Sequence, residues 1–214
     1  MISFKANLVQ RDNVQQYVTK PIVEKSGSKK GNPLKTVGYK LKINKYPVSF
    51  LELNPFDEAD QSSMERIVKI WGTKGIYTPF MSNMFQYTGD KTTDVNSRFF
   101  VLTRQSEDFD YLNPEHFLGL AQVTKLDNGR MSLDALQVNP FYLFNNPYGD
   151  IKQVGKTLMK QLLSLFSKTD FELFSPNNNV PFFELLGFNV AKSQANKNEV
   201  FMQLKNKIST GVRK

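Results

Sequence analysis

The chain reads Gly149-Asp150-Ile151-Lys152-Gln153-Val154-Gly155-Lys156-Thr157-Leu158-Met159 where an apolar, strand-like run gives way to the best amphipathic helix pattern in the sequence. Apolar residues recur at helical spacing over 151–167, with lysines between them, and this pattern predicts a helix. The first N–H groups of a helix have no partner inside it and lie at the positive end of its dipole. The start of this helix is therefore a predicted anion site, of the kind that most often holds a phosphate.

One phosphate-binding pattern is excluded by counting residues. Gly155-Lys156-Thr157 has the ending of the nucleotide-binding pattern of Gly, four residues and Gly-Lys-[Ser/Thr]. The position that requires the first glycine holds Asp150, and the glycine before it, Gly149, leaves five intervening residues. A carboxylate at that position repels phosphate, and no downstream strand ends in an acid suited to hold magnesium. We therefore do not expect an NTPase.

The sequence before this stretch is first β-rich and then helical. Strands are predicted at Ile2–Val9, Lys35–Ile43 and Val48–Leu53, with a turn-forming loop over 25–33. Helices are predicted at Asp57–Trp71 and, as a short second helix, within 76–90. Three more strands are predicted at Phe99–Thr103, Phe117–Lys125 and Met131–Val138. The last two strands are joined by Asp127-Asn128-Gly129, a strong hairpin signal because Asn and Gly tolerate positive φ.

Shorter elements follow the central helix. They are a strand at Phe171–Phe174, a loop over 175–179 that ends in a candidate N-cap, a helix at Val180–Leu186, and strands at Phe188–Ala191 and Val200–Leu204. A run of hairpins followed by strand–helix–strand predicts an α/β (α+β) fold with a mixed, mostly antiparallel central sheet flanked by helices. The parallel pair of strands is expected around the helix over 151–167.

Composition limits the possible chemistry. The 214 residues include no cysteine and the single histidine His116, which excludes thiolate metal sites and multi-histidine sites. No run of 18 apolar residues is present, so we expect no membrane span, and the N-terminal residues lack the layout of a signal peptide. These features fit a cytoplasmic protein.

The positive charge is concentrated at the two ends of the chain. Residues 1–45 hold ten Lys and Arg against two acids, and residues 197–214 hold five against one, whereas residues 46–196 hold 13 against 17. A basic segment is able to contact nucleic acid or another polyanion, but lysines this widely spaced are more typical of a solvated strand surface. Nucleic acid is therefore a possible but less favoured partner.

Three segments between Val48 and Leu204 resemble the GNAT superfamily of N-acetyltransferases. Leu133-Asp134-Ala135-Leu136-Gln137-Val138-Asn139-Pro140 resembles the fourth strand of that family, with its Val-x-Pro ending. Gln153-Val154-Gly155-Lys156-Thr157-Leu158-Met159 resembles its pyrophosphate loop and helix, whose pattern is Arg/Gln-x-x-Gly-x-Gly/Ala. Phe182-Phe183-Glu184-Leu185-Leu186-Gly187-Phe188 resembles its Phe-Tyr-Glu-x-x-Gly-Phe segment and is the most specific of the three matches.

The resemblance implies that acetyl-CoA is the cosubstrate. The amides at the helix start would bind its pyrophosphate, and a strand edge left open by splayed neighbours would pair with its extended pantetheine arm. The two lysines of this helix start would add positive charge, in the direction of the 3′-phosphate. The residues expected to contact the cosubstrate are Leu136, Gln137, Val138, Lys152, Gln153, Val154, Gly155, Lys156, Thr157, Asn178 and Phe183.

The chain departs from the family pattern at specific positions. Aligned on Gly155, the first family glycine falls on Gln153, and the Arg/Gln position falls on Asp150. Seven extra residues precede the helix, about Phe141–Pro147, and this aromatic insert is a candidate for shaping a substrate pocket or covering the cosubstrate. The tyrosine that often protonates the leaving thiolate is replaced by Phe183, so that Tyr142, Tyr148 or a water is expected to donate the proton.

Acyl transfer also needs a base and a donor to the oxyanion. By the resemblance, the N–H groups near Gln137 and Val138 serve the oxyanion, and Asp134 is the favoured base. Glu52 and His116 are weaker candidates for the base. An exposed strand position is the plainer interpretation of Asp134, and the Phe and Met residues are mainly core. Phe80, Met81, Met84 and Phe85 are nevertheless candidates for lining an acceptor site.

The sequence thus predicts an acetyltransferase that moves acetyl from acetyl-CoA to an amine by direct transfer in a ternary complex. We expect a β-rich basic extension over 1–47, a GNAT-like acyl-CoA-binding domain over 48–204 and a basic tail over 205–214. The amine itself is left open among small amines, peptide N-termini and lysines. The alternative is a GNAT-like module that binds CoA, protein or nucleic acid with little or no catalysis.

Overall fold

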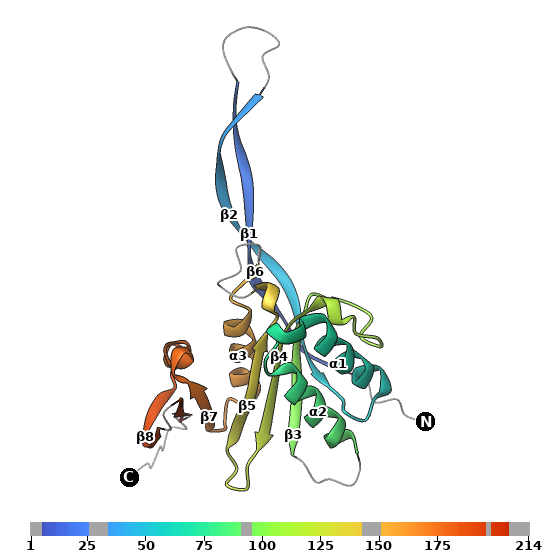
Figure 1. Ribbon diagram of the computed structural model, residues 1–214, viewed down its shortest axis with the longest axis vertical. Helices are drawn as coiled ribbons and strands as arrows, with labels where there is room; N and C mark the ends of the chain where they lie inside the picture. The colour runs from blue at the N-terminus through green and yellow to red at the C-terminus, as the bar shows by residue number, and fades with distance from the viewer. Residues whose placement is uncertain (1–5, 26–33, 91–95, 143–150, 196–197, 206–214) are drawn as a thin grey trace, which may run out of the picture.

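The computed structural model describes residues 6–25, 34–90, 96–142, 151–195 and 198–205. Within these ranges the strands form a nine-stranded sheet in the order β6-β1-β2-β3-β4-β5-β7-β9-β8 (Figure 1). The strands are β1 (Asn7–Lys25), β2 (Leu34–Leu53), β3 (Ser97–Thr103), β4 (Phe117–Lys125), β5 (Met131–Val138), β6 (Ile151–Lys152), β7 (Phe171–Pro176), β8 (Asn189–Ala195) and β9 (Glu199–Leu204). The α-helices are α1 (Glu58–Trp71), α2 (Thr78–Gly89), α3 (Val154–Leu165) and α4 (Val180–Glu184).

Helices cover both faces of the sheet, and each face has its own core (Figure 1). Under α3 the buried residues include Phe50, Phe100, Leu118, Leu158 and Leu162. Under α1 and α2 they include Leu51, Ile67, Phe85, Phe99 and Leu120. Because neighbouring strand residues alternate between the two sets, the sheet is buried on both sides and its central strands are nearly continuous apolar runs.

The predicted sheet type is confirmed. All neighbouring strands pair antiparallel except β5 and β7, which pair parallel and are connected through α3. A parallel pair needs such a crossover, whereas antiparallel neighbours such as β4 and β5 need only the turn that ends at Gly129, where φ is +80°. The bounds predicted for β4 and β5 coincide with the observed ones.

The N-terminal part of the sheet differs from the prediction. Two long strands, β1 and β2, pair from Asn7↔Glu52 to Lys25↔Leu34, and their far end extends away from the rest of the molecule (Figure 1). The sequence predicted three short strands instead, because residues 10–25 are polar and alternate weakly. Residues 1–5 and 26–33 of the predicted first strand and loop lie outside the described residues. Since β2 runs through residue 47, the division at that position stays a prediction.

The central helix begins later than its apolar pattern indicated. Ile151 and Lys152 form β6, which pairs with Gln16 and Gln15 of β1, and α3 starts only at Val154. Pairing with a strand far away in sequence therefore overrides the local periodicity. Other ends shift by a few residues, and the predicted cap at Asn179 makes no side-chain hydrogen bond to α4. Asp57 does cap α1, accepting from the N–H groups of Ala59 and Asp60.

No helix within the described ranges is long and apolar enough to cross a membrane.

Candidate active site

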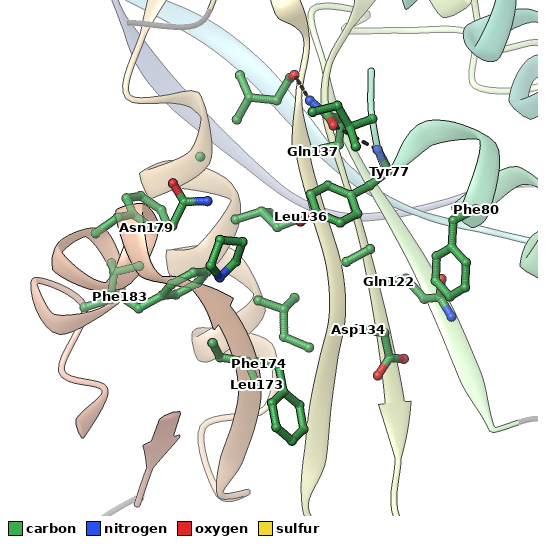
Figure 2. A pocket seen from close by; sticks show the side chains of 18 of the residues that line it. Tyr77, Phe80, Gln122, Asp134, Leu136, Gln137, Leu173, Phe174, Asn179 and Phe183 are labelled. Atoms are coloured by element: carbon green, nitrogen blue, oxygen red, sulfur yellow. Dashed lines mark hydrogen bonds between the residues drawn. The ribbon is translucent and has the colours of Figure 1, made fainter. Parts of the chain in front are cut away.

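A cleft of about 1090 Å³ lies where β5 and β7 diverge. The two strands pair only from Met131↔Phe171 to Leu133↔Leu173, and no pairing continues beyond that point. Residues from the later parts of both strands, Leu136 and Phe174 among them, line the cleft (Figure 2). The opening is therefore a gap in the sheet itself, and it joins the α3 side of the sheet to the α2 side.

A β-bulge at Asp134 accounts for this divergence. The register of β4 and β5 runs Val123↔Leu133 and then Gln122↔Ala135, so Asp134 is the extra residue on β5. Before the bulge Leu133 packs into the core under α3, and after it Ala135 packs into the core under α1 and α2. Such a bulge bends its strand and re-aims the following side chains, which separates β5 from β7.

The far half of β5 leaves one backbone edge open. The N–H of Asn139 donates to the carbonyl oxygen of Leu118 on β4 at 2.8 Å. Because N–H groups alternate along a strand, those of Leu136 and Val138 point to the opposite edge, away from β4 and toward the cleft. These two amides are thus the groups on β5 that are oriented to bind an extended or oxyanionic ligand.

The start of α3 forms one wall of the cleft. Gln153, directly before the helix, has left-handed backbone angles (φ 63°, ψ 18°) and its side chain makes no cap hydrogen bond. A Cβ on Gly155 would lie 3.2 Å from Cγ2 of Val138, so a glycine lets this helix start approach β5 closely. Lys156 is exposed and lines the same wall. Uncapped amides, a close approach and a lysine together suit a phosphate.

Asp134 lies on the α2 side of the cleft in a small network of hydroxyl groups. Its carboxylate accepts hydrogen bonds from the hydroxyls of Thr124 and Ser132, and Thr124 is also bonded to Ser97 at 2.7 Å. Asp134 is exposed, as its plainer interpretation indicated, but protein atoms around the cleft partly desolvate its carboxyl group, and this desolvation raises the pKa of Asp134 above 3.8, while the two hydrogen bonds lower it. A carboxylate of raised pKa is a stronger base than an ordinary aspartate.

Two further residues of the α2 side bear on the site. Gln122 on β4 is buried and lines the cleft, and its Oε1 has no hydrogen-bond partner. Gln137 on β5 accepts from the N–H of Tyr77 at 3.3 Å and donates to the carbonyl of Val138 at 2.8 Å, which ties the start of α2 to β5 (Figure 2). Gln137 therefore connects two elements that line this side of the cleft.

The cleft brings together most of the residues that the sequence indicated. Those that line it are Asp134, Leu136, Gln137, Val138, Tyr142, Gln153, Val154, Gly155, Lys156 and Phe183. Thr157 is buried and does not line the cleft. Asn178 is exposed, and its neighbour Asn179 lines the cleft instead. Lys152 is in β6. Tyr148 lies outside the described residues.

The weaker candidates for a base lie elsewhere. Glu52 is held by Arg98 in a two-bond ion pair with both distances 2.6 Å, and it does not line the cleft. His116 is in the short helix after β3, away from the cleft, and its Nδ1 is buried without a partner. Of the predicted acceptor residues, Phe80 and Met84 line the cleft, whereas Met81 and Phe85 are in the core.

Sequence reasoning missed the polar residues that surround Asp134. Gln122, Thr124 and Ser97 are on β4 and β3, and they share the sheet face of Asp134. The signal available in the sequence was the two-residue spacing of Gln122 and Thr124 in an otherwise apolar strand. That spacing predicts a common face, but only the strand order brings the face to Asp134.

Comparison with known proteins identifies the fold. No protein-family model matches the sequence, and no curated protein matches it either. An acetyltransferase structure from Thermus thermophilus superposes with a TM-score of 0.50 at 10% identity, over 73% of this chain and 96% of that one. The predicted α/β (α+β) fold with its mixed, mostly antiparallel sheet is confirmed, and this acetyltransferase structure shares it.

Two further structures are similar over comparable lengths. A protein from Desulfovibrio desulfuricans, assigned to the GNAT family, gives a TM-score of 0.49 at 16% identity, over 74% of this chain and 98% of that one. The PaiA N-acetyltransferase of Thermoplasma acidophilum, in complex with coenzyme A, gives 0.46 at 16% identity with the same coverage.

Proposed function

We propose that the protein is an N-acetyltransferase that uses acetyl-CoA and transfers the acetyl group directly to an amine in a ternary complex. The observation that carries this proposal is the cleft itself, which leads from the uncapped start of α3, past the open edge of β5, to the carboxyl group of Asp134. An anion site, an extended amide edge and a base thus follow one another along a single opening.

The residues of the cleft fit acetyl-CoA. The first amides of α3 and Lys156 are suited to its pyrophosphate, and the close approach of Gly155 to Val138 keeps this end narrow. The outward N–H groups of Leu136 and Val138 suit its pantetheine amides and the carbonyl oxygen of the acetyl group. When bound there, acetyl-CoA supplies the thioester whose acetyl group is transferred.

Asp134 is proposed to remove the proton from the amine, directly or through a water. The amine then forms a C–N bond to the acetyl carbon as the C–S bond breaks, and the departing thiolate takes up a proton. Tyr142 lines the cleft and carries a phenol suited to give that proton, whereas the neighbouring Phe183 has none to give. The hydroxyls of Thr124 and Ser132 hold the carboxylate of Asp134 in position.

The test is a measurement of product. The purified chain is incubated with acetyl-CoA and a panel of amines, and free thiol and acetylated amine are both quantified. We expect equal amounts of the two products, and both should form far more slowly in Asp134→Asn. Thiol released without any acetylated amine would mean hydrolysis alone and would contradict transfer.

A second function is favoured by one observation. Phe183 is buried against Phe182 and Phe188 at the position where the family has its tyrosine, so a module that binds CoA with weak or no catalysis is the alternative. Binding of acetyl-CoA without acetylation of any amine in the panel favours this alternative.

A further inference from the structure

Helix α2 presents a second apolar surface toward the cleft, and Met84 of this surface also packs partly against the core. Met81 and Phe85 point into the core, with exposed fractions of 1% and 0%. Phe80 and Met84, on a different side of the helix, line the cleft together with Tyr77 at the helix start, and Tyr77 and Phe80 are 37% and 50% exposed. Residues three and four positions apart share a helix side, so these three side chains form one apolar wall.

The sheet face next to α2 in the cleft is polar. Gln122, Thr124 and Asp134 share this face, and Figure 2 draws Gln122 and Asp134 on the same side of the cleft as Tyr77 and Phe80. Each oxygen of Asp134 accepts one hydroxyl hydrogen bond and keeps a second lone pair. Gln122 is buried in this face, and its Oε1 has no hydrogen-bond partner within the structure.

The charge on this side limits the ligand to one cation. Among the described residues that line the cleft, Asp134 is the single carboxyl group contributed by the α2 side, since Glu199 is on β9 beside β7. Lys74, at the rim next to α2, is exposed and repels a second positive charge. A polyamine or an aminoglycoside carries several cations, and the described residues of this surface include no second carboxylate for them.

We propose that the acceptor is a small primary amine with a single positive charge, carried on an aromatic or other apolar group. Its ammonium hydrogen-bonds to Asp134, and its apolar part lies against Tyr77, Phe80 and Met84. This assignment rests on the proposed acetyl transfer, but the binding of the amine is measurable without it. Phe80 then determines acceptor specificity through apolar contact.

The experiment compares 2-phenylethylamine with putrescine and with a lysine-containing peptide. We expect kcat/KM for 2-phenylethylamine to exceed the other two at least tenfold. Phe80→Ala should raise the KM for 2-phenylethylamine about tenfold and leave the KM for acetyl-CoA unchanged. The control is Tyr87→Ala, which should change neither KM, because Tyr87 is an exposed residue of α2 that does not line the cleft. The shift of the melting temperature by acetyl-CoA reports whether each variant still folds.

The outcomes separate this proposal from the proposed function. Equal or better use of putrescine or of the peptide overturns the acceptor class and leaves acetyl transfer standing. If no amine is acetylated, calorimetric titration of the chain with 2-phenylethylamine tests whether the amine site exists. Binding that is lost in Phe80→Ala and absent for putrescine supports the amine site, and no binding overturns it.

Discussion

Gly155 at the start of α3 lies against Val138 at the end of β5, so close that a Cβ on the glycine would meet Cγ2 of the valine at 3.2 Å. This contact joins the two parts of the cleft that the proposed mechanism needs side by side. The uncapped helix start is suited to phosphate, and the open strand edge to amide groups and an oxyanion. The contact therefore keeps the proposed phosphate site next to the proposed oxyanion site.

The backbone just before α3 is under strain that a substitution should relieve. Gln153 has φ 63°, a left-handed conformation that costs a non-glycine residue about 1–2 kcal/mol. Glycine adopts it freely but loses more backbone entropy on folding, so Gln153→Gly should stabilise the fold by about 0.5–1 kcal/mol. Denaturant unfolding measures the difference.

The control for this prediction is Gln86→Gly. Gln86 is in α2 with helical backbone, so glycine there should destabilise the fold by about 1 kcal/mol. Loss of stability in both variants would contradict strain at Gln153.

Removal of the carboxylate of Asp134 should slow the reaction and change its pH dependence. General-base catalysis contributes roughly 10²–10⁴-fold, so Asp134→Asn should lower kcat by about 10²-fold or more. Desolvation raises the pKa of Asp134 above 3.8, so activity of the native chain should fall as pH decreases through that raised pKa. The acid-side decline should disappear in the variant.

The matched control is Asp127→Asn, in the exposed turn between β4 and β5. It should retain both the rate and the acid-side decline. An Asp134→Asn variant with native kcat would assign the base to another group.

The phenol of Tyr142 should matter for departure of the thiolate. Tyr142→Phe is expected to lower kcat about tenfold or more with little change in the KM for acetyl-CoA, because proton transfer to the leaving group is lost. Adding Phe183→Tyr to this variant should restore part of the rate. Tyr111→Phe, which alters an exposed tyrosine bonded to Arg66, is the control. A native rate in Tyr142→Phe would assign the donor role to water or another residue.

Asp60 should make the fold less stable as the solution approaches neutral pH. The carboxyl group is buried and accepts the N–H of Asn54 at 2.8 Å, and desolvation by burial raises its pKa from 3.8 to about 7. Between these two values the folded state holds a proton that the unfolded state has lost. Stability is therefore complete below about pH 4 and falls toward pH 7, by up to about 1.4 kcal/mol per pH unit.

Asp60→Asn keeps an acceptor for Asn54 and has no titrating proton. Its unfolding free energy should lose this decline, whereas Glu58→Gln, at an exposed position in the same first turn of α1, should keep it. Parallel pH profiles of the native chain and Asp60→Asn would contradict the raised pKa.

The sequence allowed the central part of the fold to be predicted, and tertiary pairing determined the rest. The alternation over Met131–Val138 and the helical spacing after Val154 were strong enough to locate β5 and α3. Residues 10–25 are too polar for their own sequence to indicate a strand. They form part of β1 because β2 pairs along them. β6 was not predictable either, because a strand of two residues carries no periodicity.

The residues of the candidate site were likewise predictable only in part. Gly155, Val138 and Asp134 were predictable because they lie within one continuous segment with recognisable patterns. Gln122 and Tyr77 were not, because β4 and α2 reach Asp134 and Gln137 only through the order of strands in the sheet and the packing of a helix on it. The bulge at Asp134 also escaped prediction, since it is a property of the register between two strands.

The binding of acetyl-CoA tests the central claim most directly. The melting temperature is measured while acetyl-CoA is titrated, with Gly155→Val as the variant that fills the contact with Val138 and Ser164→Val, at an exposed position of α3, as its control. We predict that saturating acetyl-CoA stabilises the native chain and the control, by about 2.7 kcal/mol at 100 times Kd, and stabilises Gly155→Val far less. An unchanged melting temperature of the native chain at millimolar acetyl-CoA would contradict the account.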